Sequence, residues 1–136
     1  DFCLSRGLGD VYKRQPKSYQ AMPGRPRRFA DRTNGVKIDF LVTGLFPGSG
    51  VPGPISYPDP TAVSELIEDA RVVDLATLIQ LKLAARRYQD FADVVALIRV
   101  HDLDEAFAAQ LHATVRGDYI ECLEEKRRED EYEARQ

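Results

Sequence analysis

Hydrophobic and polar residues alternate between Val36 and Thr43, and this alternation is the clearest strand signal in the chain. The two faces of the expected strand carry Val36, Ile38, Phe40 and Val42 on one side and Lys37, Asp39, Leu41 and Thr43 on the other. A period of two is expected when one face of a strand packs on a core. Asn34-Gly35 signals a tight turn just before it, so we expect a hairpin whose first arm is Arg28 to Arg32.

Segments rich in glycine and proline lie on both sides of this hairpin. Pro16 to Arg28 is basic and contains Pro23, Gly24 and Pro26, so we interpret it as a loop without stable structure. Glycine and proline also dominate residues 44–60, where neither a helix nor a central strand can persist. Gly48-Ser49-Gly50 in this segment does not form a phosphate loop, because prolines flank it and no helix follows. A short strand is expected at residues 70–73.

From Leu75 onward, the apolar spacing predicts helices at residues 75–87, 91–100 and 104–111 and a long one from about residue 113. In the first of them Lys82 and Arg86 fall in the middle of the apolar stripe that Leu75, Leu78 and Ile79 define. Burying an unpaired charge is costly. These cations therefore extend their charged ends into water, pair with carboxylates, or contact an anion.

Two aspartates near the second helix have simple structural interpretations. Asp90 is well placed as the N-cap, and Asp93 would then lie in the first turn, where a negative charge favours the helix dipole. His101 and His112 are isolated and have no spacing that suggests a metal site, so we interpret them as surface or capping residues. Residues 124–136 are charged on every side, which is typical of a solvated helix end or frayed tail.

The string from Ser5 to Gln15 looks like one translated reading frame of the adapter that transposase-based sequencing libraries attach to DNA ends. The alternative is a basic N-terminal arm that binds nucleic acid through Arg6, Lys13 and Arg14. Residues 1–15 are therefore not assigned to the fold, and we expect them not to pack on the domain. The natural sequence then starts near Pro16, and the chain is expected to be a fragment whose true N-terminal portion is missing.

The remaining residues are enough for one domain. The whole chain has a formal net charge of −3, so it lacks the overall positive charge typical of nucleic-acid-binding domains. Only Cys122 remains once residues 1–15 are excluded, so no intrachain disulfide is expected and a reducing compartment fits best. No apolar run approaches the roughly 20 residues of a membrane span, and we expect a cytoplasmic protein without membrane contact.

Three segments together resemble bacterial nucleotidyltransferase-fold proteins, relatives of the abortive-infection toxin group. They are residues 36–43, residues 53–60, and residues 78–84 followed by 87–93, which read VKIDFLVT, GPISYPDP, LIQLKLA and RYQDFAD. The resemblance covers about Phe29 to Tyr119. It implies an α/β (α+β) fold, with the C-terminal part of a nucleotidyltransferase-like mixed sheet and a helical C-terminal half. Residues 16–123 would then be a partial domain and residues 124–136 a charged helical tail.

In that family, a Gly-Ser turn and a following Asp-x-Asp pair supply two metal-binding carboxylates, and a third lies on a later strand. Asp39 matches the third, so the resemblance implies that it is a catalytic residue and a ligand of Mg²⁺. Transfer of a nucleotide from a triphosphate needs charge stabilisation that magnesium ions on hard oxygen ligands provide. Four helical residues match the family's helical motif, with implied roles in triphosphate contact or in bracing the site: Lys82, Arg87, Asp90 and Asp93.

This sequence departs from the family pattern, because no Gly-Ser turn with Asp-x-Asp precedes Asp39 and the segment between Lys82 and Arg87 is short. Truncation before Pro16 explains the missing motif, so we expect the fragment to be inactive and to bind Mg²⁺ weakly. Two hypotheses remain open. The intact protein transfers a nucleotide from an NTP to an unknown acceptor, or it is a catalytically degenerate module that binds a nucleotide or a protein partner, such as an antitoxin.

Overall fold

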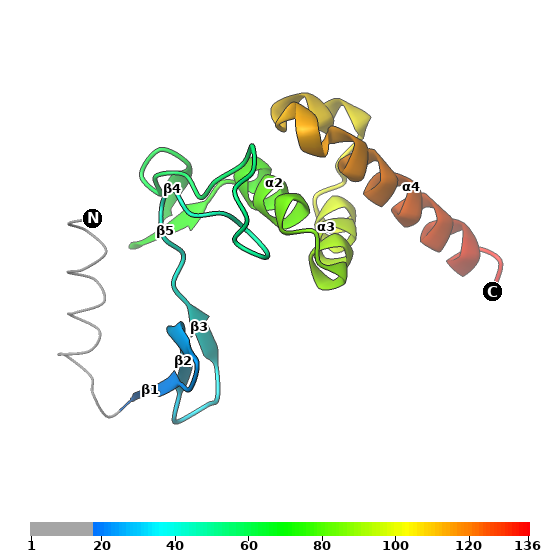
Figure 1. The fold of residues 1–136 in the computed structure, drawn as a ribbon. Coiled ribbons are helices and arrows are strands. Elements are labelled where there is room, and N and C mark those ends of the chain that lie inside the picture. The colour runs from blue at the N-terminus through cyan, green and yellow to red at the C-terminus, as the bar shows by residue number, and fades with distance from the viewer. Residues whose placement is uncertain (1–17) are drawn as a thin grey trace. The chain divides into compact units, whose positions relative to one another are not determined.

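The computed structural model describes residues 18–136, so the expectations for the adapter-like residues 1–15 lie outside its described part. The fold is mixed α+β, with small antiparallel sheets in the N-terminal part and a helical C-terminal half (Figure 1). The chain divides into two compact units that join between Val42 and Thr43. Each unit is described by itself below.

The first unit contains a three-stranded antiparallel sheet in the order β1-β2-β3. Its strands are β1 (Tyr19–Met22), β2 (Arg25–Asp31) and β3 (Lys37–Asp39). The predicted hairpin is confirmed, since β2 pairs with β3 and places Phe29 opposite Ile38. Gly35 has a φ of 73° in the turn between them, as the Asn-Gly signal requires. The second arm is shorter than predicted, and the chain beyond Asp39 leaves the sheet.

The interpretation of Pro16 to Arg28 as a loop without stable structure was wrong. From residue 19 this stretch forms β1 and the start of β2, which pair with each other around Pro23-Gly24. Gly24 has a φ of 70°, so proline and glycine mark a tight turn between two strands. The backbone partners that stabilise β1 lie on β2, and local composition does not reveal them.

The glycine- and proline-rich start of the second unit has no helix or strand from Gly44 to Pro60, as predicted. Backbone hydrogen bonds still order it, because Gly44 N donates to Tyr57 O at 2.9 Å and Tyr57 N donates to Leu45 O at 2.8 Å. The predicted strand is confirmed as β5 (Ala70–Val73). Its antiparallel partner β4 (Ser64–Ile67) was missed. The turn between them has no glycine or proline to signal it, and Glu68 adopts a φ of 52°.

The helical half consists of α2 (Leu75–Ala85), α3 (Tyr88–Val100), two short 3₁₀ helices, η1 (Glu105–Gln110) and η2 (Ala113–Val115), and α4 (Arg116–Glu133). The predicted helices are confirmed with shifted ends. Asp74 caps α2 by accepting a hydrogen bond from Thr77 N at 2.7 Å. The prediction that Asp90 is the N-cap of the next helix was wrong, because Arg87 takes that position and Asp90 lies in the first turn.

These helices bury one apolar core. It consists of Ile55, Ile79, Leu83, Val94, Val95, Ile98, Leu111, Val115, Tyr119, Cys122 and Leu123. Tyr119 is fully buried and its hydroxyl donates to Asp104 O at 2.8 Å. Cys122 is a free thiol, and burial raises its pKa to about 11. Among residues 18–136, no helix combines the length and apolar character needed to cross a membrane.

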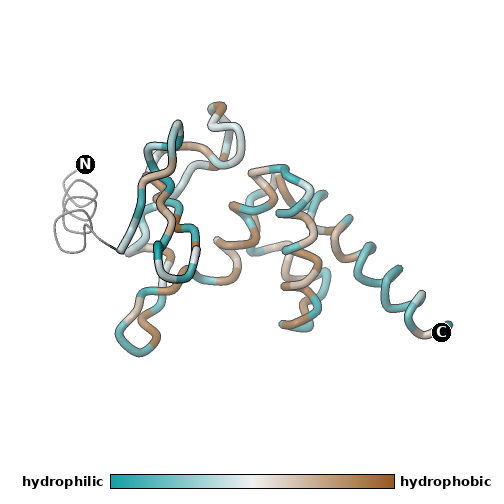
Figure 2. The backbone as a smooth tube through the Cα atoms, turned by 90° about the horizontal axis from the view of Figure 1, so that it is seen from below, coloured by the Kyte–Doolittle hydropathy of each residue, from teal (hydrophilic) through white to brown (hydrophobic). Residues whose placement is uncertain are grey.

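Both histidines have the roles expected of them: His101 ends α3 as its C-cap, and His112 caps η2. The charged end of the chain is an ordered helix rather than a frayed tail, since α4 continues to Glu133. Figure 2 shows its last turns as mainly hydrophilic. Ion pairs support this end, with Arg99 on α3 donating to Glu129 at 2.6 Å.

Gly48 lies directly against the end of α2. It has a φ of 69°, and a Cβ added there would overlap the carbonyl oxygen of Ala85. We expect Gly48→Ala to lower the free energy of unfolding by about 2 kcal/mol, since left-handed backbone costs about 1–2 kcal/mol and the overlap adds to it. Gly50→Ala is the matched control, with a φ of 77° and open space around the new Cβ. Equal losses in urea denaturation would show that contact with Ala85 does not matter.

Candidate functional site

Asp39, which the resemblance marks as a metal ligand, is the last residue of β3 and lies opposite Arg28 of β2. Its carboxylate accepts hydrogen bonds from Arg28 Nε at 2.5 Å and Nη2 at 2.7 Å. Its side chain is 47% exposed, so it faces away from the core as predicted. These hydrogen bonds raise the pKa of Arg28 above its ordinary value. Two strands and a two-point ion pair therefore orient this carboxylate.

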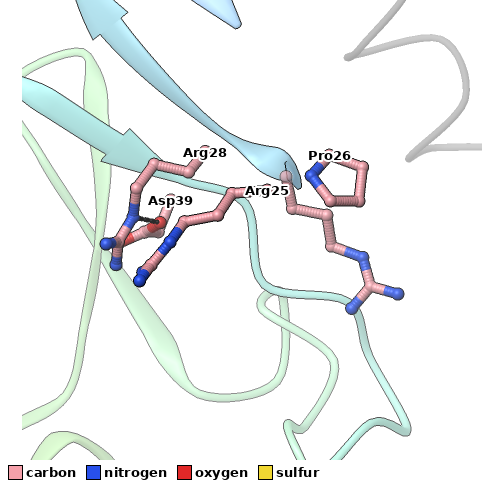
Figure 3. A pocket seen from close by; sticks show the side chains of 5 residues that line it. Arg25, Pro26, Arg28 and Asp39 are labelled. Atoms are coloured by element: carbon pink, nitrogen blue, oxygen red, sulfur yellow. Dashed lines mark hydrogen bonds and ion pairs between the residues drawn. The ribbon is translucent and has the colours of Figure 1, made fainter. Parts of the chain in front are cut away.

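A shallow hollow of about 230 Å³ lies beside Asp39. Its lining residues are Arg25, Pro26, Arg27, Arg28 and Asp39. Figure 3 shows the guanidinium of Arg28 against the carboxylate of Asp39 in this hollow. Three arginines and one carboxylate therefore line the same hollow.

The hollow coincides with an irregularity in the pairing of β1 with β2. Ala21 lies opposite Phe29, but the next residue, Met22, lies opposite Arg25, so residues 26–28 have no partner on β1. Such a bulge breaks the ladder and redirects side chains. We did not predict a site here, because this segment was interpreted as a loop. The sequence signal that could have found it is the basic cluster from Arg25 to Arg28.

The four helical residues that match the family motif form one ion-pair network between α2 and α3. Lys82 Nζ lies 2.7 Å from Asp93 Oδ2 and 3.7 Å from Asp90 Oδ1. Arg87 Nε donates to Asp90 Oδ2 at 2.6 Å. Asp90 is buried, with 4% of the residue exposed. Of the alternatives for Lys82, the structure selects pairing with carboxylates.

Arg86, the other cation of the apolar stripe, has a different setting. It ends α2 with a φ of 55°, and its side chain is 67% exposed. Its Nη1 lies 3.2 Å from Asp118 Oδ2 on α4. The Asp118 side chain is 16% exposed, but the guanidinium is largely solvated, so the pair contributes about 1 kcal/mol or less. Arg86 is therefore a surface residue, and only Lys82 is held in the half-buried network.

The structure thus brings Lys82, Arg87, Asp90 and Asp93 together in the second unit, whereas Asp39 belongs to the first. Within residues 18–136, no group of three His, Cys, Asp or Glu side chains is arranged to hold a metal ion. Asp39 is bound by Arg28, and the two helical aspartates are bound by Lys82 and Arg87. The described residues alone do not fit Mg²⁺, which requires several oxygen ligands in octahedral geometry.

Comparisons of the chain with protein-family models, with curated proteins and with solved structures give no match.

The network predicts a specific loss of stability in acid. Hydrogen bonds from Lys82, and then from Gln89, lower the pKa of Asp93 below its ordinary value. A lowered folded-state pKa stabilises the protein above the unfolded value of about 4, and this stability is lost as pH falls through the folded pKa. Urea denaturation at pH 7 and pH 3 should show a smaller acid loss for Asp93→Asn than for the wild type. An unchanged loss would assign the acid sensitivity to other carboxylates.

Proposed function

We propose that this chain is part of a metal-dependent nucleotidyltransferase, which transfers a nucleotide from an NTP to an acceptor, and that Asp39 is one of its metal-binding carboxylates. The supporting observation is the setting of Asp39, a half-exposed carboxylate fixed on a strand beside three arginines. Nucleotide transfer depends on positively charged groups around the reacting phosphates. On this proposal, β1 to β3 belong to the mixed sheet of a nucleotidyltransferase fold, and the protein is cytoplasmic.

On this proposal, Lys82, Arg87, Asp90 and Asp93 brace the domain. Their charges are directed at one another across α2 and α3, and the carboxylate of Asp90 is almost fully buried. A buried carboxylate with cationic partners fixes the position of the helices that carry it, because separating the charges would be costly. Direct contact of Lys82 with a triphosphate is less favoured, because the lysine would have to break its ion pairs with two carboxylates.

The magnesium proposed for the intact protein needs carboxylates besides Asp39. Bound Mg²⁺ would supply charge stabilisation at the phosphate under attack. The other ligands would have to come from outside residues 18–136, where the resemblance implies a Gly-Ser turn with an Asp-x-Asp pair.

The alternative is a catalytically degenerate module that binds a nucleotide or a protein partner such as an antitoxin. One observation favours it: Arg28 occupies both oxygens of Asp39, which a metal ion would have to share. Sequence upstream of residue 16, recovered from an overlapping genomic read, separates the two proposals. An intact Gly-Ser turn with Asp-x-Asp, together with Mg²⁺-dependent transfer of label from NTPs by the longer protein, supports the enzyme. Loss of that motif supports the binding module.

A further inference from the structure

The first unit is basic although the chain as a whole is acidic. In residues 18–42, the cations outnumber the carboxylates: Arg25, Arg27, Arg28, Arg32 and Lys37 against Asp31 and Asp39. The formal net charge of the whole chain is −3. A local excess of positive charge on a small sheet attracts anions to that sheet.

Within this unit, the excess is concentrated in the hollow at the β2 bulge. Asp39 neutralises Arg28 through two hydrogen bonds. Arg25 and Arg27 are both exposed, and no carboxylate of residues 18–136 forms an ion pair with either. Among the described residues, two guanidinium groups without a carboxylate partner therefore line one hollow.

The chemistry of these groups favours phosphate as the ligand. A guanidinium presents several N–H donors in a planar fork that matches phosphate oxygens and remains charged at any physiological pH. The bulge also interrupts the pairing of β1 with β2 at residues 26–28. The side chains of these residues therefore have no neighbours opposite them on β1. Two arginines that line one hollow can contact successive phosphates of one ligand.

We propose that this hollow binds the phosphate chain of a nucleoside triphosphate, with Arg25 and Arg27 in contact with it and the Arg28–Asp39 ion pair as a positioning element. The inference rests on the proposed function and assigns it a triphosphate contact within this chain. The ligand is a free triphosphate rather than an RNA strand, because the hollow at the bulge has a volume of only about 230 Å³.

The test measures binding to the 136-residue chain by isothermal titration at low salt without metal, with ATP, inorganic tripolyphosphate and AMP as separate probes. ATP and tripolyphosphate are expected to bind at least tenfold more tightly than AMP. The double variant Arg25→Gln/Arg27→Gln should weaken ATP binding about tenfold, which corresponds to about 1.4 kcal/mol. Arg32→Gln is the matched control, because it removes a charge from the same unit outside the hollow, and it should leave binding within about twofold.

Three results would overturn the inference: equal binding of AMP and ATP, equal losses in the double variant and in Arg32→Gln, or tight binding of a single-stranded RNA oligonucleotide with no binding of ATP. Circular dichroism of each variant checks that the sheet is retained. Failure of this inference is distinguishable from failure of the proposed function. If the longer protein transfers nucleotides but this chain does not bind tripolyphosphate, the hollow is not the phosphate site. If this chain binds tripolyphosphate but the longer protein never transfers a nucleotide, the enzyme proposal fails.

Discussion

Replacing Lys82 with methionine is expected to lower the free energy of unfolding by about 2–3 kcal/mol, although methionine is the more apolar side chain. Lys82 pairs with Asp93 at 2.7 Å and lies 3.7 Å from the buried carboxylate of Asp90. Removing one member of a buried pair costs about 3–5 kcal/mol. The expected loss is smaller here, because Lys82 is 25% exposed and Arg87 still pairs with Asp90.

Arg86→Met is the matched control for this substitution. Both positions belong to the same predicted apolar stripe, but Arg86 is largely exposed, so its substitution should change stability by about 1 kcal/mol or less. Urea denaturation at pH 7 measures both variants. If Lys82→Met is neutral or stabilising, the lysine only covers apolar surface with its stem and the network does not brace the helices.

The elements that the sequence predicted well are those whose signal is local and repeated. The alternation before and after Asp39 predicted a strand, and its alternating exposure is observed from Lys37 to Thr43. The helices from Leu75 onward show an apolar spacing that can be read from their own residues. A single core buries their apolar faces. Their ends were less accurate, because Arg86 stops α2 in a left-handed conformation that no glycine signals.

The features that were missed depend on partners distant in the sequence or on pairing register. β1 and β4 are short strands without a clear alternation, and each is held by the neighbouring strand across a turn. The bulge that creates the arginine hollow is a three-residue shift in register between Ala21 and Met22. Lys82 and Asp93 were both identified as site residues, but their contact requires the angle between α2 and α3, which composition does not encode.

In the longer protein, Asp39→Asn is expected to reduce nucleotide transfer at least 100-fold, the loss typical of removing one electrostatic stabiliser of a transition state. Asparagine keeps the shape of the side chain but lacks the negative oxygen that binds a metal ion. Stability should change little, because the pair of Asp39 with Arg28 is partly exposed and such pairs contribute about 0–1 kcal/mol. Asp31→Asn is the matched control, since Asp31 lies on the same sheet outside the hollow and its Oδ1 accepts a hydrogen bond from Thr33 N.

The decisive measurement is Mg²⁺-dependent transfer of label from α-labelled NTPs by the longer protein and its two variants, with a melting curve for each. The proposed function predicts transfer by the wild type and by Asp31→Asn, and loss of transfer by an Asp39→Asn protein that melts at nearly the wild-type temperature. Wild-type rates in Asp39→Asn would contradict the assignment of Asp39, and an intact Asp-x-Asp motif without any transfer would contradict the enzyme itself.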